Sequence, residues 1–298
     1  MSDSPLARGA AAAALGVSTQ AFDLLRDLIG RELGLDFDGA RASLLEDKLA
    51  DVATRHGVRS HLDFYYMLRY DQEREALWAE VADVLAVPET FFWRQPEQIL
   101  ALVRGVVPAL LARDPGPVRI WSAACCSGEE PLSIAIALHA EGLALDRFQI
   151  RGSDASPRLL DRARRGIYGE RSLRRLPEPL RARYFAPVEG GWRIDPAVHR
   201  AVEWRRANLV DPAEAAPLAR ADVVFCRNVF IYFSDEAVRR VVETLETQMP
   251  EDATLFLGAA ESLARIPTRF QLQEIEGAFV YRKGAEAAAP AAPHRVAG

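Results

Sequence analysis

The chain has 298 residues, of which 49% are hydrophobic and 27% charged, and a formal net charge of −5. This composition is ordinary for a globular protein with one large domain or two, and it lacks the basic signature of a nucleic-acid-binding protein. No apolar run approaches the roughly 18 residues of a membrane span. We therefore expect neither nucleic-acid binding nor membrane insertion.

The N-terminal third of the chain predicts a helical domain. Residues 1–17 are rich in alanine, contain an early Asp3 and lack a basic segment, so we interpret them as a flexible tail, not a signal peptide. From 18 to 88, apolar residues recur at helical spacing, beginning with Phe22, Leu25, Ile29 and Leu33. Four such segments predict a four-helix bundle that ends at about Pro88.

After about Pro108 the pattern changes to alternating strands and helices. Segments such as VRIWSA, FQIRGSD and ADVVFCRNV predict strands, and EEPLSIAIALHAEG predicts a helix. This alternation predicts an open, largely parallel sheet with helices on both faces, in a domain that spans 89–283. Aromatic and β-branched runs around Gly190-Gly191 predict a small antiparallel hairpin, a β-subdomain at about 183–206. Residues 284–298 are expected to form a disordered tail.

Polar residues follow three of the predicted strands: Gly128-Glu129-Glu130, Asp154 and Arg227-Asn228. In open α/β sheets, ligands bind beyond the carboxyl ends of the strands. Two glutamates after a single glycine would repel the phosphates that a dinucleotide places at such a turn. S-adenosylmethionine (SAM) carries an ammonium and a sulfonium instead, and carboxylates attract both. The alternative is that both acids simply stabilise a helix N-terminus.

Two further features of this region have alternative interpretations. Asp154 lies about two dozen residues beyond the first turn, a spacing at which an acidic residue hydrogen-bonds a ribose. It could instead be the N-cap of the next helix. Cys125 and Cys126 have no Cys-x-x-Cys pattern or neighbouring His cluster, so we predict no metal site and interpret them as packing thiols. With Cys226, they show no disulfide pattern and favour a reducing, cytoplasmic compartment.

Several motifs occur in the order seen in CheR-type chemotaxis methyltransferases. They are ETFFWR (89–94), IWSAACCSGEEPLSIAI, GSDAS, RARRGIY, NL (208–209), FCRNVFIYF (225–233) and LGAAESL (257–263). The chain resembles this family from its helical N-terminal part to about Arg282. The resemblance implies a Rossmann-like SAM-dependent methyltransferase domain after an all-α domain. It also implies protein-glutamate O-methylation of chemoreceptors, with S-adenosylhomocysteine as the second product.

The resemblance assigns site residues by position. Cofactor contacts fall on Thr90, Arg94, Glu130, Asp154, Asn208, Leu209, Arg227 and Asn228. The catalytic end falls on Arg94, Arg227 and Tyr232, and Glu129 is left as a helix-end acid. Many family members have Asn two residues before the threonine, where this chain has Pro88. A glutamate acceptor has an unperturbed pKa near 4.3 and is ionised at neutral pH, so no general base is required.

Partner surfaces are expected on two basic stretches. The resemblance implies that a basic face of the second helix, with Arg41, Lys48 and Arg55, docks on the receptor. The arginine-rich stretch Arg151–Arg183 is a second candidate. For both, a solvated charged surface is the alternative. The hairpin is shorter than in members that bind a receptor's C-terminal peptide, so we expect no dependence on such a peptide, and a monomer.

Two other functions compete with the receptor methyltransferase. One is a SAM-dependent methyltransferase that acts on another protein or on a small molecule. The other is a non-catalytic SAM-binding sensor, which would result if Pro88 disables transfer.

Overall fold

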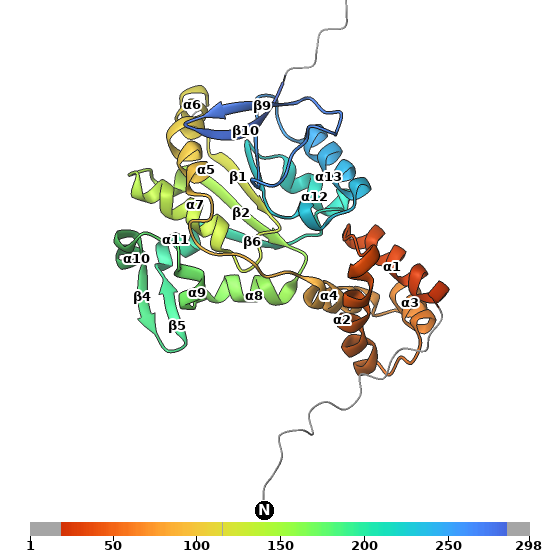
Figure 1. Ribbon diagram of the computed structural model, residues 1–298. Coiled ribbons are helices and arrows are strands. Elements are labelled where there is room, and N and C mark those ends of the chain that lie inside the picture. The colour runs from red at the N-terminus through yellow and green to blue at the C-terminus, as the bar shows by residue number, and fades with distance from the viewer. Residues whose placement is uncertain (1–18, 115, 285–298) are drawn as a thin grey trace, which may run out of the picture.

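The computed structural model describes residues 19–114 and 116–284, which form a helical domain and a larger sheet domain (Figure 1). The tails expected at 1–17 and 284–298 lie outside this range, apart from Gly284. Within the described ranges, no helix combines the length and the hydropathy that a membrane crossing requires.

The helical domain has its own hydrophobic core, as the apolar spacing predicts. Its helices are α1 (Thr19–Leu33), α2 (Ala42–Arg55), α3 (His61–Tyr70) and α4 (Arg74–Leu85). Each helix contributes a fully buried residue to this one core: Leu25, Leu45, Phe64 and Val81. Ser60 caps α3 by accepting a hydrogen bond from Asp63 N.

The larger domain is built on a seven-stranded sheet in the order β6-β2-β1-β7-β8-β10-β9. The first five strands in this order are parallel, and β10 and β9 are antiparallel to their neighbours. The strands are β1 (Val118–Ala123), β2 (Phe148–Asp154), β6 (Val202–Arg206), β7 (Val223–Cys226), β8 (Thr254–Leu257), β9 (Phe270–Ile275) and β10 (Ala278–Lys283). The expectation of a largely parallel sheet is confirmed.

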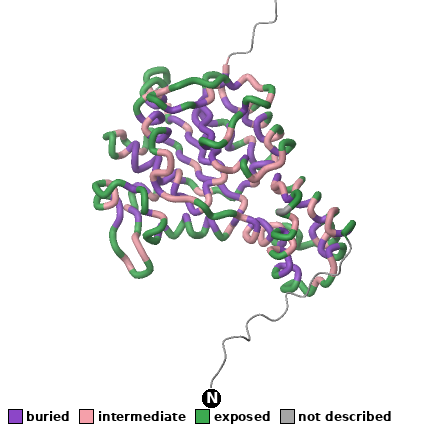
Figure 2. Tube along the Cα trace, viewed as in Figure 1, coloured by how far each residue is buried: buried purple, intermediate pink, exposed green. Residues whose placement is uncertain are grey.

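Helices cover both faces of this sheet, as expected. Alternate residues of β1 point to opposite faces, so Ile120 joins one hydrophobic cluster and Trp121 the other. Figure 2 shows the buried residues concentrated along the strands. The Ile120 face is covered by α5 (Pro96–Ala101), a π-helical turn (Leu102–Val106), α6 (Val107–Arg113) and α7 (Glu129–Ala140). The Trp121 face is covered by α12 (Pro212–Ala219) and α13 (Asp235–Gln248).

A separate three-stranded antiparallel sheet contains the predicted hairpin. Its order is β3-β5-β4, with β3 (Ile167–Tyr168), β4 (Phe185–Val188) and β5 (Gly191–Ile194). Gly191 must lack a side chain, because a Cβ at this position would lie 2.4 Å from Tyr168 O. The bounds therefore differ from the expected 183–206. The subdomain gains β3, which lies earlier in the chain, and β6 pairs with β2 in the main sheet instead.

Short helices connect the two sheets. They are α8 (Pro157–Arg165), α9 (Glu170–Leu173), α10 (Glu178–Tyr184) and α11 (Pro196–Arg200). Figure 1 shows α8 extending from the helical domain to the three-stranded sheet. Hydrogen bonds join α4 to the start of α8, where Asp83 Oδ1 accepts from Ser156 Oγ and from Arg158 N. The helical domain is thus bonded directly to the domain that carries the cleft.

Candidate functional site

A cleft lies at the carboxyl ends of β1, β2 and β7, where the sequence predicts ligand binding. It has two adjoining compartments that share Val87, Ala124, Cys126, Asn228 and Tyr232. We call them the polar and the apolar compartment. The polar compartment is lined by the predicted residues Thr90, Arg94, Glu130 and Arg227. The apolar compartment is lined by the predicted residues Asp154, Asn208 and Leu209. Every predicted site residue therefore lines one cleft, although each role remains a prediction.

Arg227 is the buried cation of the polar compartment. Its side chain is only 1% exposed, and its Nε lies 3.1 Å from Glu130 Oε2. Its Nη2 donates to Arg94 O at 2.7 Å, and burial lowers the pKa of the guanidinium. Neither Nε nor Nη1 makes a hydrogen bond with good geometry to any described residue. A buried arginine with unused donors is a favourable place for a carboxylate from outside the chain.

The two glutamates that follow Gly128 have separate surroundings. Glu130 lines the polar compartment and accepts from Ser122 Oγ at 2.6 Å. Glu129 is 1% exposed, and its carboxylate accepts from Ser127 and Ser172 Oγ, each at 2.8 Å. Burial raises the pKa of Glu129. It does not line the cleft, so Glu130 is the one of the pair that a ligand can reach.

Asp154 lines the apolar compartment and connects two backbone turns. Its Oδ2 accepts from Cys126 N and its Oδ1 from Ser156 N, both at 2.9 Å. The N-cap of α8 is Ser156, which decides against the N-cap interpretation of Asp154. Burial raises the pKa of Asp154. A carboxylate has about four lone-pair sites, so each oxygen can still accept a ribose hydroxyl.

Asn208 and Leu209 line the apolar compartment, but the sequence does not predict their contacts within the chain. Asn208 Nδ2 donates to Glu32 O at 2.6 Å, and its Oδ1 accepts from Val210 N. The amide is thus used within the chain and joins the sheet domain to the helical domain. Leu209 is buried and contributes apolar surface.

Cys126 differs from its interpretation as a packing thiol. Cys125 and Cys226 are buried, but Cys126 is partly exposed and lines both compartments. Burial raises the pKa of all three thiols well above the usual value, so they remain protonated at neutral pH. Cys126 therefore contributes a neutral, polarizable surface to the cleft.

Strained backbone gathers around the cleft. Seven described residues other than glycine have positive φ, and five of them lie in its loops: Trp93, Gln95, Ala124, Cys126 and Asn228. Residues in this region cost free energy unless the surrounding structure fixes them. Their concentration indicates that the loops are fixed by other contacts.

One such contact is the carboxylate of Glu261, which the sequence analysis does not assign to the site. It accepts from the backbone N–H groups of Asn228, Val229, Phe230 and Gly258 at 2.6–2.8 Å. It thereby holds the turn that follows β7 and carries Asn228 and Tyr232. Glu261 lies in the motif LGAAESL, which belongs to the resemblance, but its spacing does not indicate that its carboxylate binds backbone N–H groups of this turn.

The helical domain also forms part of the cleft. Leu33, Leu35 and Leu85 line the apolar compartment. Leu35 forms an isolated antiparallel bridge with Phe233, and Asp36 N donates to Tyr232 O at 2.8 Å. Helical spacing identifies Leu33 only as an apolar position of α1, and no sequence signal shows that it faces a ligand cleft.

The residues present fit S-adenosylmethionine. The unused donors of Arg227 suit the carboxylate of a methionine group, and Glu130 suits its ammonium. The apolar compartment, with Leu35, Leu85 and Val229, suits a purine ring, and Asp154, which also lines it, suits the hydroxyls of a ribose. No group of three or more His, Cys, Asp or Glu residues able to hold a metal occurs in the described ranges.

Comparison with known proteins agrees with this chemistry. The family model described as CheR methyltransferase, SAM binding domain, matches residues 88–279, and that of the CheR all-alpha domain matches residues 20–86. Chemotaxis protein methyltransferase 2 of Vibrio cholerae is 32% identical over 88% of this chain and 92% of its own length. Chemotaxis protein methyltransferase 1 of Pseudomonas aeruginosa is 32% identical over 88% and 97%. The probable biofilm formation methyltransferase WspC of Pseudomonas aeruginosa is 33% identical over 92% of this chain and 64% of its own length.

Proposed function

Because the chain belongs to the CheR methyltransferase family, with S-adenosylmethionine as its cofactor, we propose that it methylates glutamate side chains of chemoreceptors. The products are glutamate methyl esters and S-adenosylhomocysteine. The proposed reaction serves adaptation in a chemosensory pathway. Relatives named for chemotaxis support this role.

The observation that carries the proposal is that the carboxylates lining the cleft already have partners within the chain. In the described ranges neither His nor Lys lines it, and each of its carboxylates already has partners. Glu130 pairs with Arg227, Asp154 accepts two backbone amides, and Glu89 pairs with two arginines. No side chain is therefore free to act as a general base. The acceptor that suits such a cleft is one that is already ionised, and a glutamate carboxylate is ionised at neutral pH.

The chain's own residues then act by positioning and by excluding water. When bound, S-adenosylmethionine supplies an activated methyl group on a sulfonium. Arg227 and Glu130 would hold the charged end of the cofactor, and the apolar compartment would hold its base. Arg94 and Tyr232, at the wall of the polar compartment, would orient the incoming carboxylate. Arg94 is already fixed through Nη1, which donates to Glu89 O at 2.7 Å.

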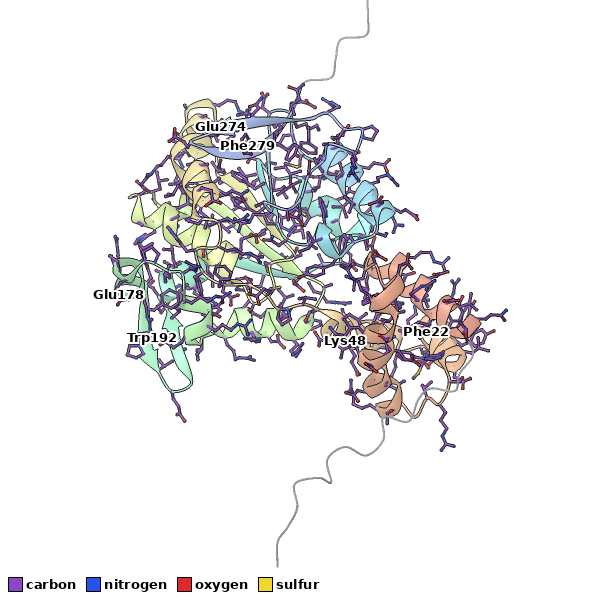
Figure 3. The ribbon with its side chains drawn as sticks, viewed as in Figure 1. Phe22, Lys48, Glu178, Trp192, Glu274 and Phe279 are labelled. Atoms are coloured by element: carbon purple, nitrogen blue, oxygen red, sulfur yellow. The ribbon has the colours of Figure 1, made fainter. Side chains whose placement is uncertain are left out.

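Two basic surfaces are proposed to meet the receptor's acidic helices. Arg41 precedes α2 and is exposed, Lys48 is half-buried on α2, and Arg55 pairs with Glu80 at 3.0 Å. The other surface follows Arg151–Arg183 through α8 and α9. In Figure 3, Lys48 on the helical domain and Trp192 on the three-stranded sheet lie near opposite ends of α8. Both surfaces could therefore contact one elongated partner.

Two further proposals concern the form in which the enzyme acts. The hairpin of β4 and β5 is joined by only Glu189-Gly190, and we expect methylation without a receptor C-terminal peptide. A receptor truncated before that peptide should be methylated as fast as the intact one. The chain is expected to act as a monomer, which sedimentation at the assay concentration would test.

The main proposal is tested with methyl-labelled S-adenosylmethionine, the full-length chain and membranes that contain a chemoreceptor. The expected result is alkali-labile label on receptor glutamates. A receptor whose acceptor glutamates are changed to glutamine serves as the control and should remain unlabelled. Label that is stable to alkali, or that appears only on small metabolites, would contradict the proposal. Cofactor binding without any transfer would favour a sensor.

A further inference from the structure

A carboxylate of the chain itself is held between two arginines at the wall of the polar compartment. Glu89 lines this compartment, and its side chain is 44% exposed. Its Oε2 lies 2.8 Å from Arg171 Nη2, and its Oε1 lies 2.9 Å from Arg174 Nη2. Each oxygen of one carboxylate therefore has its own guanidinium. We call Arg171 and Arg174 the arginine pair.

The arginine pair is held in place by the site. Arg174 Cζ stacks 3.9 Å from the ring centroid of Phe91, which also lines the polar compartment. Arg174 Nη1 donates to Arg171 O at 2.6 Å, which ties the two residues to each other. The pair is therefore arranged for a carboxylate in advance, and less conformational freedom is lost when one binds.

Helix α9, which carries Arg171 and is followed directly by Arg174, is anchored to the buried end of α7. Ser172 of α9 donates to Glu129, and its carbonyl accepts from Phe92 N at 2.8 Å. Phe92 is fully buried. The backbone around the pair is thus fixed on one side by a buried carboxylate and on the other by the segment that carries Glu89.

Nothing in the interaction requires the carboxylate to belong to this chain. Arg171 is 81% exposed, and solvent-exposed ion pairs contribute little to stability. A carboxylate from another molecule can therefore replace Glu89 at small cost. An acidic acceptor segment that brings one glutamate into the polar compartment passes this position with its neighbouring acids.

We infer that Arg171 and Arg174 bind an acidic side chain of the acceptor protein next to the glutamate being methylated, and that Glu89 occupies this position in the free enzyme as an internal competitor. This inference rests on the proposed function. The partner is an acidic protein segment, recognised by its carboxylates. Because the pair binds acceptor and not cofactor, its loss changes the apparent affinity for the acceptor and leaves cofactor binding intact.

The experiment uses the full-length chain, receptor-containing membranes and labelled S-adenosylmethionine. The double variant Arg171→Ala/Arg174→Ala is expected to raise the KM for receptor about tenfold, with kcat and the cofactor Kd within about twofold of wild type. Glu89→Gln frees the pair without removing it and is expected to lower that KM about threefold. Arg104→Ala is the control, because Arg104 is an exposed arginine that pairs with Glu141 at 2.8 Å, lies outside both proposed receptor surfaces and does not line the cleft.

The outcomes separate this inference from the proposed function. If wild-type enzyme labels no receptor glutamate, the proposed function is wrong, and the inference with it. If wild type is active and the double variant keeps the wild-type KM, the arginine pair does not bind acceptor. A KM that rises in Glu89→Gln would show that Glu89 supports the site and does not compete. An equal rise of KM in Arg104→Ala would show only a general effect of positive charge.

Discussion

Two neighbouring glutamates at the start of α7 differ in what their carboxylates contact. Glu130 faces the cleft and pairs with Arg227, whereas Glu129 is enclosed by Ser127 and Ser172. Their adjacent positions make them a matched pair for substitution. A change at either residue alters the first turn of the same helix, so a difference in effect must come from their contacts.

Glu130→Gln is expected to weaken binding of S-adenosylmethionine by about 10- to 100-fold, because it removes the charge that faces the ligand and leaves Arg227 without its counter-ion. Glu129→Gln should change the same Kd by less than about twofold, since its carboxylate does not reach the cleft. Titration calorimetry measures both values. Equal losses of affinity in the two variants would contradict the prediction that only Glu130 contacts the cofactor.

The raised pKa of Glu129 predicts a pH dependence of folding. Burial raises its folded-state pKa above the ordinary 4.5, so between the two values the folded state binds more protons than the unfolded state. The contribution of Glu129 to stability is then greatest below about pH 4.5 and falls as pH rises to its folded-state pKa, by about 1.4 kcal/mol per unit of difference.

Glu129→Gln should flatten this part of the plot of unfolding free energy against pH. Urea unfolding measured from about pH 4 to about pH 8 covers the titration of such a group. Asp154, whose pKa is also raised by burial, leaves a residual slope of the same sign. Profiles of wild type and variant that run parallel would contradict the assignment to Glu129.

At the scale of elements, the turn after β7 depends on a single acceptor. Glu261→Ala removes the partner of four backbone N–H groups that hold Asn228 at a φ of 58°. We expect a loss of about 2–4 kcal/mol of stability together with weaker cofactor binding. Urea unfolding and calorimetry measure the two effects.

The control for this prediction is Glu246→Ala. Glu246 likewise accepts from a backbone amide, Arg269 N, and from Thr268 Oγ1, but it does not line the cleft. It should lower stability and leave the cofactor Kd unchanged. If both variants bind cofactor as wild type does, Glu261 has only a structural role.

Elements were predictable where local pattern and final environment agree. The helices of the N-terminal domain and the strands with polar ends follow from apolar spacing, and the cleft follows from where those strands end. For residues 96–113 we predict no element, but they form α5, a π-helical turn and α6. Pro96 and Pro108 lie in the first turns of α5 and α6, where proline is tolerated. We predict no strand at β9, whose sequence alternates only from Phe270 to Gln273 and is followed by a second polar residue, Glu274, and most of its residues are exposed.

At the scale of the whole molecule, the cleft is shared between domains. Its apolar wall includes Leu33 and Leu35 of the helical domain, and Gly34 between them has a φ of +77°. Nothing in the sequence of α1 predicts this, because the contact depends on how two separately folded cores meet. The cofactor should therefore stabilise both domains together on heating.

Gly34→Ala tests this arrangement. The added Cβ would lie 2.6 Å from Val210 Cγ1, so the residues packed between the two domains must shift. We expect about tenfold weaker cofactor binding and a loss of about 1–3 kcal/mol of stability. Gly57→Ala is the matched control, with a similar φ of +70° and no atom within 4 Å of the new Cβ. Equal effects of both changes on the cofactor Kd would argue against the shared wall.

The bridge between Leu35 and Phe233 has a consequence for how such enzymes can diversify. A gene exchange that replaces the helical domain, with the surface proposed to meet the receptor, also replaces one wall of the apolar compartment, where we propose that the methyl donor binds. The exchanged unit can stay functional only if the chain following α1 remains compatible with residues about two hundred positions away. New receptor specificity is thus expected to arise through point substitutions on exposed surfaces more often than through domain shuffling.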